Sequence, residues 1–305
     1  RVAKKFTEHF AAKANFSYLQ AKEWTTSDDR NVTAGAIDNG LIGHENNQNY
    51  DGVNTYGDEV STFIPNVGQV SRTGYRDQDL MDNKAVNTKA DVSLHFKPWA
   101  NDFEIILQHK LGFGNTIYQG ANRYALKDFY MDQTRLEVKG KNFFARVYRT
   151  SEDAGNSYDT RFAAINVNRL AKSDTNWFTD YAKAFQLSSA MFGYDANTAA
   201  DYARTFADTN VSPGLGLAPN IDPLNPSAPR NARFEPGSAE FNKALASVIT
   251  NPNLKEGAKF QDRSKILHGD LNYNFKNDFN KEITPERIVE QFCYENLYRF
   301  YHNRI

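Results

Sequence analysis

The strongest constraint on the fold is a stretch between Asn101 and Tyr124 in which apolar and polar residues alternate. Successive side chains of a β-strand point to opposite faces, so this alternation predicts a strand with one apolar and one polar face. The apolar face holds Phe103, Ile105, Leu107, Leu111 and Phe113. The polar face holds Glu104, Gln108 and Lys110. What decides the fold is whether the apolar face contacts a protein core or lipid.

Five other segments alternate in the same way, and the connections between the segments are of two kinds, short and long. The segments are residues 10–24, 90–97, 135–139, 143–149 and 267–276. Two connections, 98–101 and 140–142, have the length of hairpin turns. The other connections are long, at residues 25–88, 114–133 and 151–263. Short turns therefore alternate with long connections along the chain.

This arrangement predicts an all-β fold, namely a segment of a transmembrane antiparallel β-barrel with long, partly helical extracellular loops. Outer-membrane barrels combine short periplasmic turns with large extracellular loops, and each strand needs only about 9–11 residues, every second one apolar. A soluble antiparallel protein with two large insertions gives a similar pattern and stays as the alternative. Structureless connections of this size are uncommon inside compact soluble domains, which favours the barrel.

Composition narrows the classes of function. The hydrophobic fraction of 40% and the mean hydropathy of −0.67 are low for a single soluble core in a chain of 305 residues. There is no apolar run of about 18 residues that would predict a transmembrane helix. The net charge of −1 gives no basic excess, so no nucleic-acid partner is expected. The single cysteine, Cys293, excludes an internal disulfide framework.

The long connections carry helical patterns of their own. Apolar spacing predicts three helices, over residues 175–185, 198–207 and 238–250. Ser238 is the expected N-cap of the third helix. Residues 161–169 are a candidate further strand within the long excursion. Residues 212–230 contain five prolines and are expected to be extended and irregular.

Several long phrases resemble one known family. Two phrases resemble TonB-dependent outer-membrane receptors of the starch-utilisation-like kind, which often carry an N-terminal carboxypeptidase-regulatory-like domain. The phrases are GFGNTIYQGANRYALKDF, which begins at Gly112, and RLEVKGKNFFARVYRTSEDAGNSYDTRFAAINVNR, which begins at Arg135. Residues 5–24 and the phrase YDGVNTYGDEV, from Tyr50, resemble the barrel wall and first loops of that family. The resemblance extends over about residues 1–276.

The resemblance implies a barrel around a folded plug and TonB-dependent uptake of a bulky nutrient, such as a glycan, a peptide or a chelate, at the cell outer membrane. The implied partners are outer-membrane lipid, the nutrient, the TonB complex acting through a plug not present in this chain, and a surface lipoprotein as a candidate. Loops 25–88 and 151–263 are expected to contact the substrate or the lipoprotein. The competing hypothesis is a soluble, β-rich extracellular glycan-binding module.

Alternate residues of each strand point to opposite faces of the sheet, and each face then has an expected environment. The residues expected to face the lumen or plug are Lys13, Asn15, Ser17, Glu104, Gln108, Lys110, Glu137 and Lys139. Those expected to face lipid are Phe10, Phe16, Leu94, Phe103, Ile105, Leu107 and Leu111. His109 shares the lipid-facing parity and counts against this interpretation, because a polar ring at the membrane midplane is costly.

Two features depart from the family. Plugged transporter barrels have about 22 strands, whereas six are predicted here, so residues 1–280 are expected to supply part of a barrel wall in a fragment or a truncated gene product. Residues 281–305 show helical spacing after Thr284 and Pro285 where a further strand is due. They are interpreted as an atypical helical tail and a candidate for foreign sequence.

Neither a catalytic, a cofactor nor a metal site is predicted, no enzyme is expected, and the substrate-binding residues stay unassigned. Residues 44–51 hold one His and one Glu without a second His at ligand spacing. Residues 77–91 lack the glycine and terminal Glu of a calcium loop. Asp102 and Glu104 are interpreted as polar residues of one face rather than paired acid–base carboxylates. Glycine-containing residues 112–114 and 213–217 lack the strand–turn–helix setting of a phosphate loop.

Overall fold

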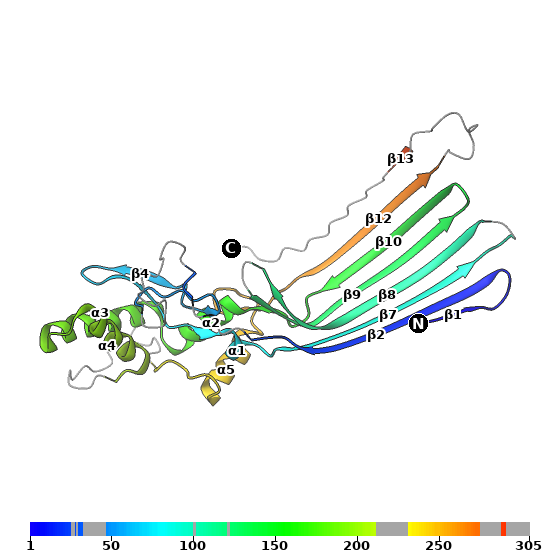
Figure 1. The fold of residues 1–305 in the computed structure, drawn as a ribbon. Helices are drawn as coiled ribbons and strands as arrows, with labels where there is room; N and C mark the ends of the chain where they lie inside the picture. The colour runs from blue at the N-terminus through cyan, green and yellow to red at the C-terminus, as the bar shows by residue number, and fades with distance from the viewer. Residues whose placement is uncertain are drawn as a thin grey trace.

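A computed structural model describes residues 1–25, 28, 30–32, 47–99, 102–120, 123–211 and 231–274, together with the backbone of 288–290. The chain has two parts (Figure 1). One is a long antiparallel sheet, and the other is a folded unit at one end of it, called the cap below, which contains all the helices of the described residues. The predicted β-rich fold is therefore confirmed at the coarse level, and the sheet is not closed into a barrel.

The sheet is a meander in which successive long strands pair with each other, and the segments of the cap are inserted between some of them. Its order is β1 (Val2–Lys5), β2 (Phe10–Lys22), β7 (Lys84–Phe96), β8 (Glu104–Gln119), β9 (Arg123–Lys139), β10 (Phe143–Asp153), β12 (Arg263–Tyr273) and β13 (Ile288–Glu290). A short strand, β11 (Tyr158–Asp159), pairs with β9 outside this order. All these pairs are antiparallel, so each long insertion leaves and re-enters the sheet at the cap end.

All six predicted strands are present, but several are longer than the alternation indicated. β7 begins at Lys84, inside the predicted loop 25–88, and β10 ends at Asp153, inside the predicted loop 151–263. The predicted loop 114–133 is wrong, because β8 and β9 extend through it and remain paired as far as Gln119 and Arg123. The polar–apolar alternation fades there because the ends of these strands pack against the cap, where Ala125 is buried in a core.

Gly114 shows why this upper part of β8 does not follow a regular pattern. The register between β8 and β9 shifts between Gly114 and Thr116, which is the irregularity expected of a β-bulge. A Cβ atom at position 114 would lie 2.1 Å from the carbonyl oxygen of Val86 on β7. Glycine is therefore required for the close approach of the two strands at this point.

The cap consists of helices and two small hairpins inserted between strands of the sheet. The helices are α1 (Asp77–Leu80), α2 (Thr160–Ala171), α3 (Asp174–Phe192), α4 (Ala196–Thr209) and α5 (Ala239–Val248). The hairpins pair β3 (Thr55–Tyr56) with β6 (Tyr75–Arg76), and β4 (Ser61–Ile64) with β5 (Gly68–Ser71). The two predicted loop regions thus fold together and share hydrophobic cores.

Two apolar clusters hold the cap together. One joins α2 and α5 to the β3–β6 hairpin and to β9, around Tyr75, Tyr158 and Phe241. The other joins α3 and α4 to the β4–β5 hairpin, around Trp177 and Phe206. Among the described residues, most of the large buried apolar side chains lie in these clusters, so the packed core sits in the cap rather than along the sheet.

The three predicted helices of the long excursion are confirmed as α3, α4 and α5, and Ser238 caps α5 by accepting a hydrogen bond from the backbone N–H of Phe241. The predicted strand at 161–169 is wrong, because these residues belong to α2. The side chain of Asp159 accepts hydrogen bonds from the N–H groups of Arg161 and Phe162, which fixes the start of that helix.

Two predictions fall on residues outside the described part of the chain. The proline-rich stretch 212–230 lies outside it, and so does most of the predicted helical tail 281–305, including Cys293. Within that tail Ile288–Glu290 form β13 and pair with β12 over Leu271–Tyr273, so the predicted helix is wrong at these three residues. Among the helices described, none is long and apolar enough to cross a membrane.

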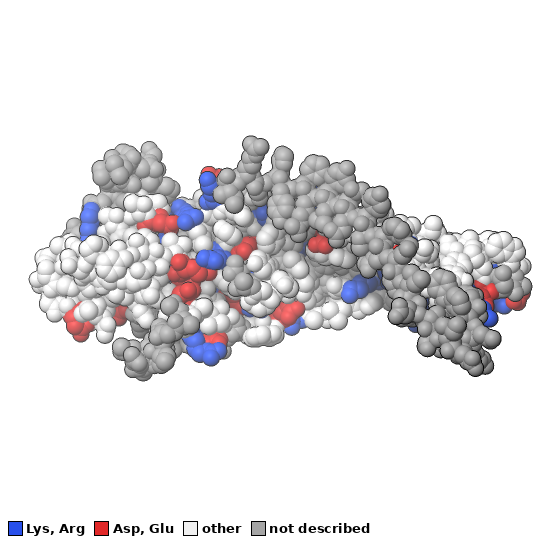
Figure 2. Space-filling view, turned by 90° about the horizontal axis from the view of Figure 1, so that it is seen from above, with Lys and Arg blue, Asp and Glu red and all other residues white. Residues whose placement is uncertain are grey.

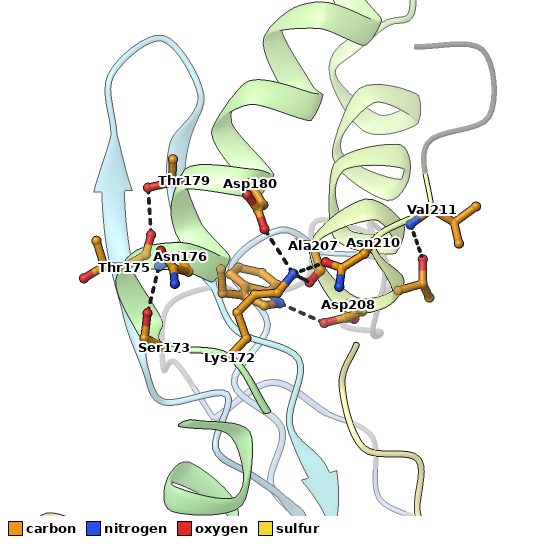
Figure 3. Close-up of polar contacts among 12 residues, drawn as sticks. Lys172, Ser173, Thr175, Asn176, Thr179, Asp180, Ala207, Asp208, Asn210 and Val211 are labelled. Atoms are coloured by element: carbon orange, nitrogen blue, oxygen red, sulfur yellow. Dashed lines mark hydrogen bonds and ion pairs between the residues drawn. The ribbon is translucent and has the colours of Figure 1, made fainter. Parts of the chain in front are cut away.

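A buried ion pair ties α2 to α3 and α4. Figure 3 shows Lys172, just after α2, reaching between these helices. Its Nζ donates to Asp180 Oδ2 at 3.0 Å, to the carbonyl oxygen of Ala207 at 2.6 Å and to Asn210 Oδ1. The side chains of Lys172 and Asp180 are each only 2% exposed, so their opposite charges offset each other away from water.

Replacing one partner of this pair should destabilise the cap more than replacing both. Lys172→Met leaves Asp180 buried without its cation, which should cost about 3–5 kcal/mol of unfolding free energy. The double variant Lys172→Met/Asp180→Leu should recover most of that loss, because neither charge is then buried alone. Chemical unfolding of the three proteins measures the difference, and equal stability of the single and double variants would contradict this account.

Candidate functional site

The apolar residues of the strands lie side by side on one face of the sheet. Register places Leu94, Leu107, Leu136 and Val147 in one row across four neighbouring strands, with exposed fractions of 40%, 47%, 44% and 42%. The adjacent row holds Phe10, Phe96, Ile105, Val138, Ala145 and Leu271. We call this surface the apolar belt. No residue of these two rows belongs to either hydrophobic core of the cap.

Aromatic side chains lie at both ends of the apolar belt. At the cap end Tyr18, Phe113 and Tyr130 occupy one row and are 57%, 49% and 39% exposed. At the turn end the Phe103 ring lies 5.1 Å from the Trp99 ring and 6.4 Å from the Phe143 ring, measured between centroids. Aromatic girdles at both interfaces are typical of outer-membrane barrels.

The sequence-based assignment of faces is confirmed by the register, while contact with lipid stays a prediction. Six of the seven residues expected to face lipid occupy the belt parity in β2, β7 and β8, and Phe103 lies just before β8. His109 also lies on this face, between Val92 and Thr134. Its Nδ1 is 3.0 Å from Thr134 Oγ1, so the ring has a polar partner on the neighbouring strand.

The opposite face of the sheet carries a network of polar contacts. Glu104 bridges two strands, with Oε1 2.6 Å from His95 Nδ1 and Oε2 3.0 Å from Lys139 Nζ. Gln108 donates to Asp91 at 2.7 Å, and further along the sheet Arg146 Nε lies 2.6 Å from Asp270 Oδ2. The residues expected to face a lumen share this parity: Lys13, Asn15, Ser17, Glu104, Gln108, Lys110, Glu137 and Lys139.

A shallow cavity of about 530 Å³ lies on the sheet near the cap. Most of its lining has the polar parity, including Asn15, Asp91, Lys110, Gln133 and Thr150, which occupy one row across five strands. Phe129 and Met131 add apolar surface. The polar face therefore offers hydrogen-bonding groups along a hollow that runs toward the cap.

A second cavity, of about 360 Å³, lies within the cap and is called the arginine cleft below. Its lining residues are Tyr50, Thr55, Arg72, Thr73, Gly74, Arg76, Asp79, Arg204, Arg233, Glu235 and Pro236. The sequence does not predict this cleft, because its four arginines come from three separate stretches of chain and match no motif. Only the fold of the cap brings them together.

The backbone of residues 71–75 forms one side of the arginine cleft and is held by hydrogen bonds with Arg204, Asp208 and Arg233. Arg204 Nη1 donates to the carbonyl oxygen of Ser71 at 3.1 Å, and Arg233 Nη2 donates to that of Gly74 at 2.5 Å. Thr73 Oγ1 donates to Asp208 Oδ2 at 2.6 Å. This segment is therefore tied both to α4 and to the chain that precedes α5.

Arg72 and Tyr75 anchor the same segment more deeply. Arg72 is 3% exposed, and its Nη1 lies 2.5 Å from Asp174 Oδ1 at the start of α3. Burial lowers the pKa of the Arg72 guanidinium, while Asp174 opposes that effect. The hydroxyl of Tyr75 donates to the carbonyl oxygen of Phe234 at 3.0 Å. The cleft is thus built on rigid, buried contacts rather than on a loose loop.

A buried carboxyl group lies behind the cleft. Asp58 is 1% exposed, its Oδ2 accepts a hydrogen bond from the backbone N–H of Gly52 at 2.9 Å, and its Oδ1 has no hydrogen-bond partner. A Cβ atom on Gly74, which lines the cleft, would lie 3.1 Å from Asp58 Cγ. Burial raises the pKa of Asp58 to about 8, so this carboxyl is largely protonated at neutral pH.

Two of the sequence candidates for metal or acid–base chemistry, residues 77–91 and the pair Asp102 and Glu104, form no such site, and His44 and Glu45 of the third candidate lie outside the described residues. Within the described residues, no group of three or more His, Cys, Asp or Glu side chains could hold a metal ion. Asp77 pairs with Arg123, and residues 84–91 belong to β7, so residues 77–91 form no calcium loop. Asp102 lies in the turn before β8, whereas Glu104 pairs with His95 and Lys139.

Comparison with known proteins gives no relative: no family model, no curated protein and no solved structure matches this chain. On the face seen in Figure 2, acidic and basic side chains are interspersed over the described part of the cap.

Asp58 should make the stability of the protein depend on pH. Its folded-state carboxyl, with a pKa of about 8, keeps a proton that the unfolded chain releases near pH 4, so its contribution to stability falls as pH rises from 4 to 8. Asp58→Asn removes this dependence. The stability of the variant relative to the parent should rise by at least about 1.4 kcal/mol between pH 5 and pH 8, the free energy of one pKa unit.

Thermal unfolding of both proteins at the two pH values tests this expectation. Burial also raises the pKa values of Asp51 and Glu59, so part of the pH dependence should remain in the variant. A stability difference that is the same at pH 5 and at pH 8 would show that Asp58 ionises normally in the folded protein.

Proposed function

We propose that this chain forms part of the wall of an outer-membrane β-barrel in a TonB-dependent receptor that takes up a bulky nutrient. The observation that carries the proposal is the distribution of polarity over the sheet. Large apolar side chains stand in register and exposed on one face, while the opposite face carries ion pairs between neighbouring strands, such as those of Glu104 with His95 and Lys139. A water-soluble sheet has the reverse arrangement, with its apolar face packed on a core.

The size of the apolar belt supports lipid as its solvent. Monomeric soluble proteins rarely expose contiguous apolar patches above a few hundred Å². Leaving such a surface in water is unfavourable, because its burial contributes about 25 cal/mol of free energy per Å². The belt crosses six strands, each of which has at least the roughly 9–11 residues that a spanning strand requires. Acyl chains remove this surface from water without any packed partner.

The two edge strands of the sheet, β1 and β13, require further strands as partners if the sheet lies in a membrane. Unpaired strand edges cannot persist in the hydrocarbon region, where each unsatisfied backbone group costs several kcal/mol. We propose that further strands close the barrel beyond β1 and β13 and that a plug fills the polar interior. In this arrangement the cap lies outside the cell, where it contacts the nutrient or a surface lipoprotein, and TonB acts on the plug.

The alternative, a soluble β-rich glycan-binding module, is favoured by one feature, namely the cap with its own cores and cleft. Cell fractionation separates the two functions. A barrel wall should be found in the detergent-extracted outer membrane of a Gram-negative host, whereas a secreted module should be found in the aqueous wash.

A pair of adjacent substitutions tests the assignment of the faces. Leu107→Lys places a charge on the apolar belt, which should cost about 2–4 kcal/mol near the bilayer midplane and lower the amount of assembled protein in the membrane. Gln108→Lys introduces the same side chain one residue away, on the polar face beside Asp91, and should assemble normally.

The comparison of these two variants controls for expression and for general effects of a new lysine. Membrane-inserted protein is measured by protease protection and by the shift in gel mobility between heated and unheated samples. Equal assembly of the Leu107 and Gln108 variants would remove the basis for lipid contact at the belt.

A further inference from the structure

We propose that the arginine cleft binds an oxyanion group, a carboxylate, sulfate or phosphate, carried by the ligand of this protein. That the ligand is the transported nutrient rests on the proposed function, but binding in the cleft requires neither a membrane nor transport. The cavity of about 360 Å³ is lined by four arginines and by two carboxylates, Asp79 and Glu235. A volume near the lower end of known ligand sites suits one small acidic group with its attached ring.

Two arginines of the cleft, Arg204 and Arg233, are only partly neutralised by the described residues. The charge of Arg72 is offset by Asp174 at 2.5 Å. Arg204 has no carboxylate within ion-pair distance among the described residues, and its terminal nitrogens donate only to neutral oxygens, of Asn47, Gln48, Ser71 and Thr73. The cation of Arg204 is therefore held in place by the cap while its charge is left without an anion.

Arg233 is in a similar position. Its ion pair with Glu235 is long, at 3.8 Å, and the Glu235 side chain is 74% exposed, so water screens this pair. The guanidinium lies 3.9 Å from the centre of the Tyr75 ring, which fixes its plane. The Nε atoms of Arg233 and Arg72 are buried and have no hydrogen-bond partner in the described structure. Buried donors of this kind are normally satisfied, so the hydrogen bonding of these guanidinium groups within the described structure is incomplete.

The chemistry of the lining matches an oxyanion better than a neutral sugar alone. Guanidinium groups bind carboxylates, sulfates and phosphates through parallel N–H···O bonds, and such charge-assisted bonds are about twice as strong as neutral ones. Tyr50, Thr55 and Thr73 contribute polar side chains to the same lining. Because residues 71–75 are fixed by contacts with α3 and α4, the site is formed before the ligand arrives and little ordering is needed on binding.

Titration calorimetry on the full chain in detergent tests the proposal with defined probes. The probes are sodium sulfate, inorganic phosphate, glucuronate and a short oligogalacturonate, with glucose and maltohexaose as neutral counterparts and sodium chloride to match ionic strength. At least one oxyanion probe should bind saturably while the neutral sugars do not. The probe that binds most tightly then identifies whether the group is a carboxylate, a sulfate or a phosphate.

Variants place the binding in the cleft. Arg204→Gln should weaken the best oxyanion probe at least tenfold, because it removes from the cleft a positive charge that no carboxylate of the described residues offsets. Arg204→Lys should retain part of the affinity because it keeps the charge. Arg161→Gln removes one positive charge from the same cap, outside the cleft lining, and should leave binding unchanged. Arg76→Gln, at an exposed cleft position, serves where loss of Arg204 prevents folding.

Two results would overturn the proposal. One is the absence of saturable binding by every oxyanion probe in a chain whose near-ultraviolet circular dichroism shows a folded cap. The other is equal binding by the parent, the folded Arg204→Gln or Arg76→Gln variant, and the Arg161→Gln control. Neither result bears on membrane insertion, so failure of this site is distinguishable from failure of the proposed transport function.

Discussion

The constraint on which the structure depends is the registered alternation of polarity across the sheet. One parity brings apolar side chains of neighbouring strands into continuous rows, and the other brings opposite charges and amides into contact, as in Glu104 with His95 and Lys139. A shift of one residue in any strand would place apolar groups in the polar network and charges in the belt. The register is therefore fixed by both faces, although no second layer of the described residues packs on the rows of the apolar belt.

The cap differs from the sheet, because it has hydrophobic cores of its own, one of which also includes Ala125 of β9. Its insertions supply compact cores around Tyr75, Tyr158 and Trp177, and buried ion pairs such as Lys172 with Asp180 set the positions of the helices. The residue 71–75 segment connects these parts to the cleft. Rigid scaffolding of this kind allows a surface unit at the end of a sheet to present a preformed binding site.

The sequence predicts the parts of this fold that follow from local periodicity, and misses those that depend on distant contacts. The alternation around Leu107 predicts both the strand and its faces, and Ser238 marks the start of α5. The segment 161–169 alternates but forms a helix, because the Asp159 cap and the burial of Ala163 and Val167 against the cap core prevail over the local pattern. Arg204 and Arg233 could not be predicted as site residues, since only tertiary structure joins them.

We propose that the belt contacts acyl chains while the opposite parity faces water. Nitroxide labels at Leu107→Cys and Gln108→Cys, in a Cys293→Ser background reconstituted in bilayers, measure this directly through collisions with oxygen and with a water-soluble nickel complex. The account predicts that oxygen, which concentrates in lipid, dominates at position 107 and that nickel dominates at position 108. Strong nickel collisions at both positions, or protection of both within a protein core, would contradict it.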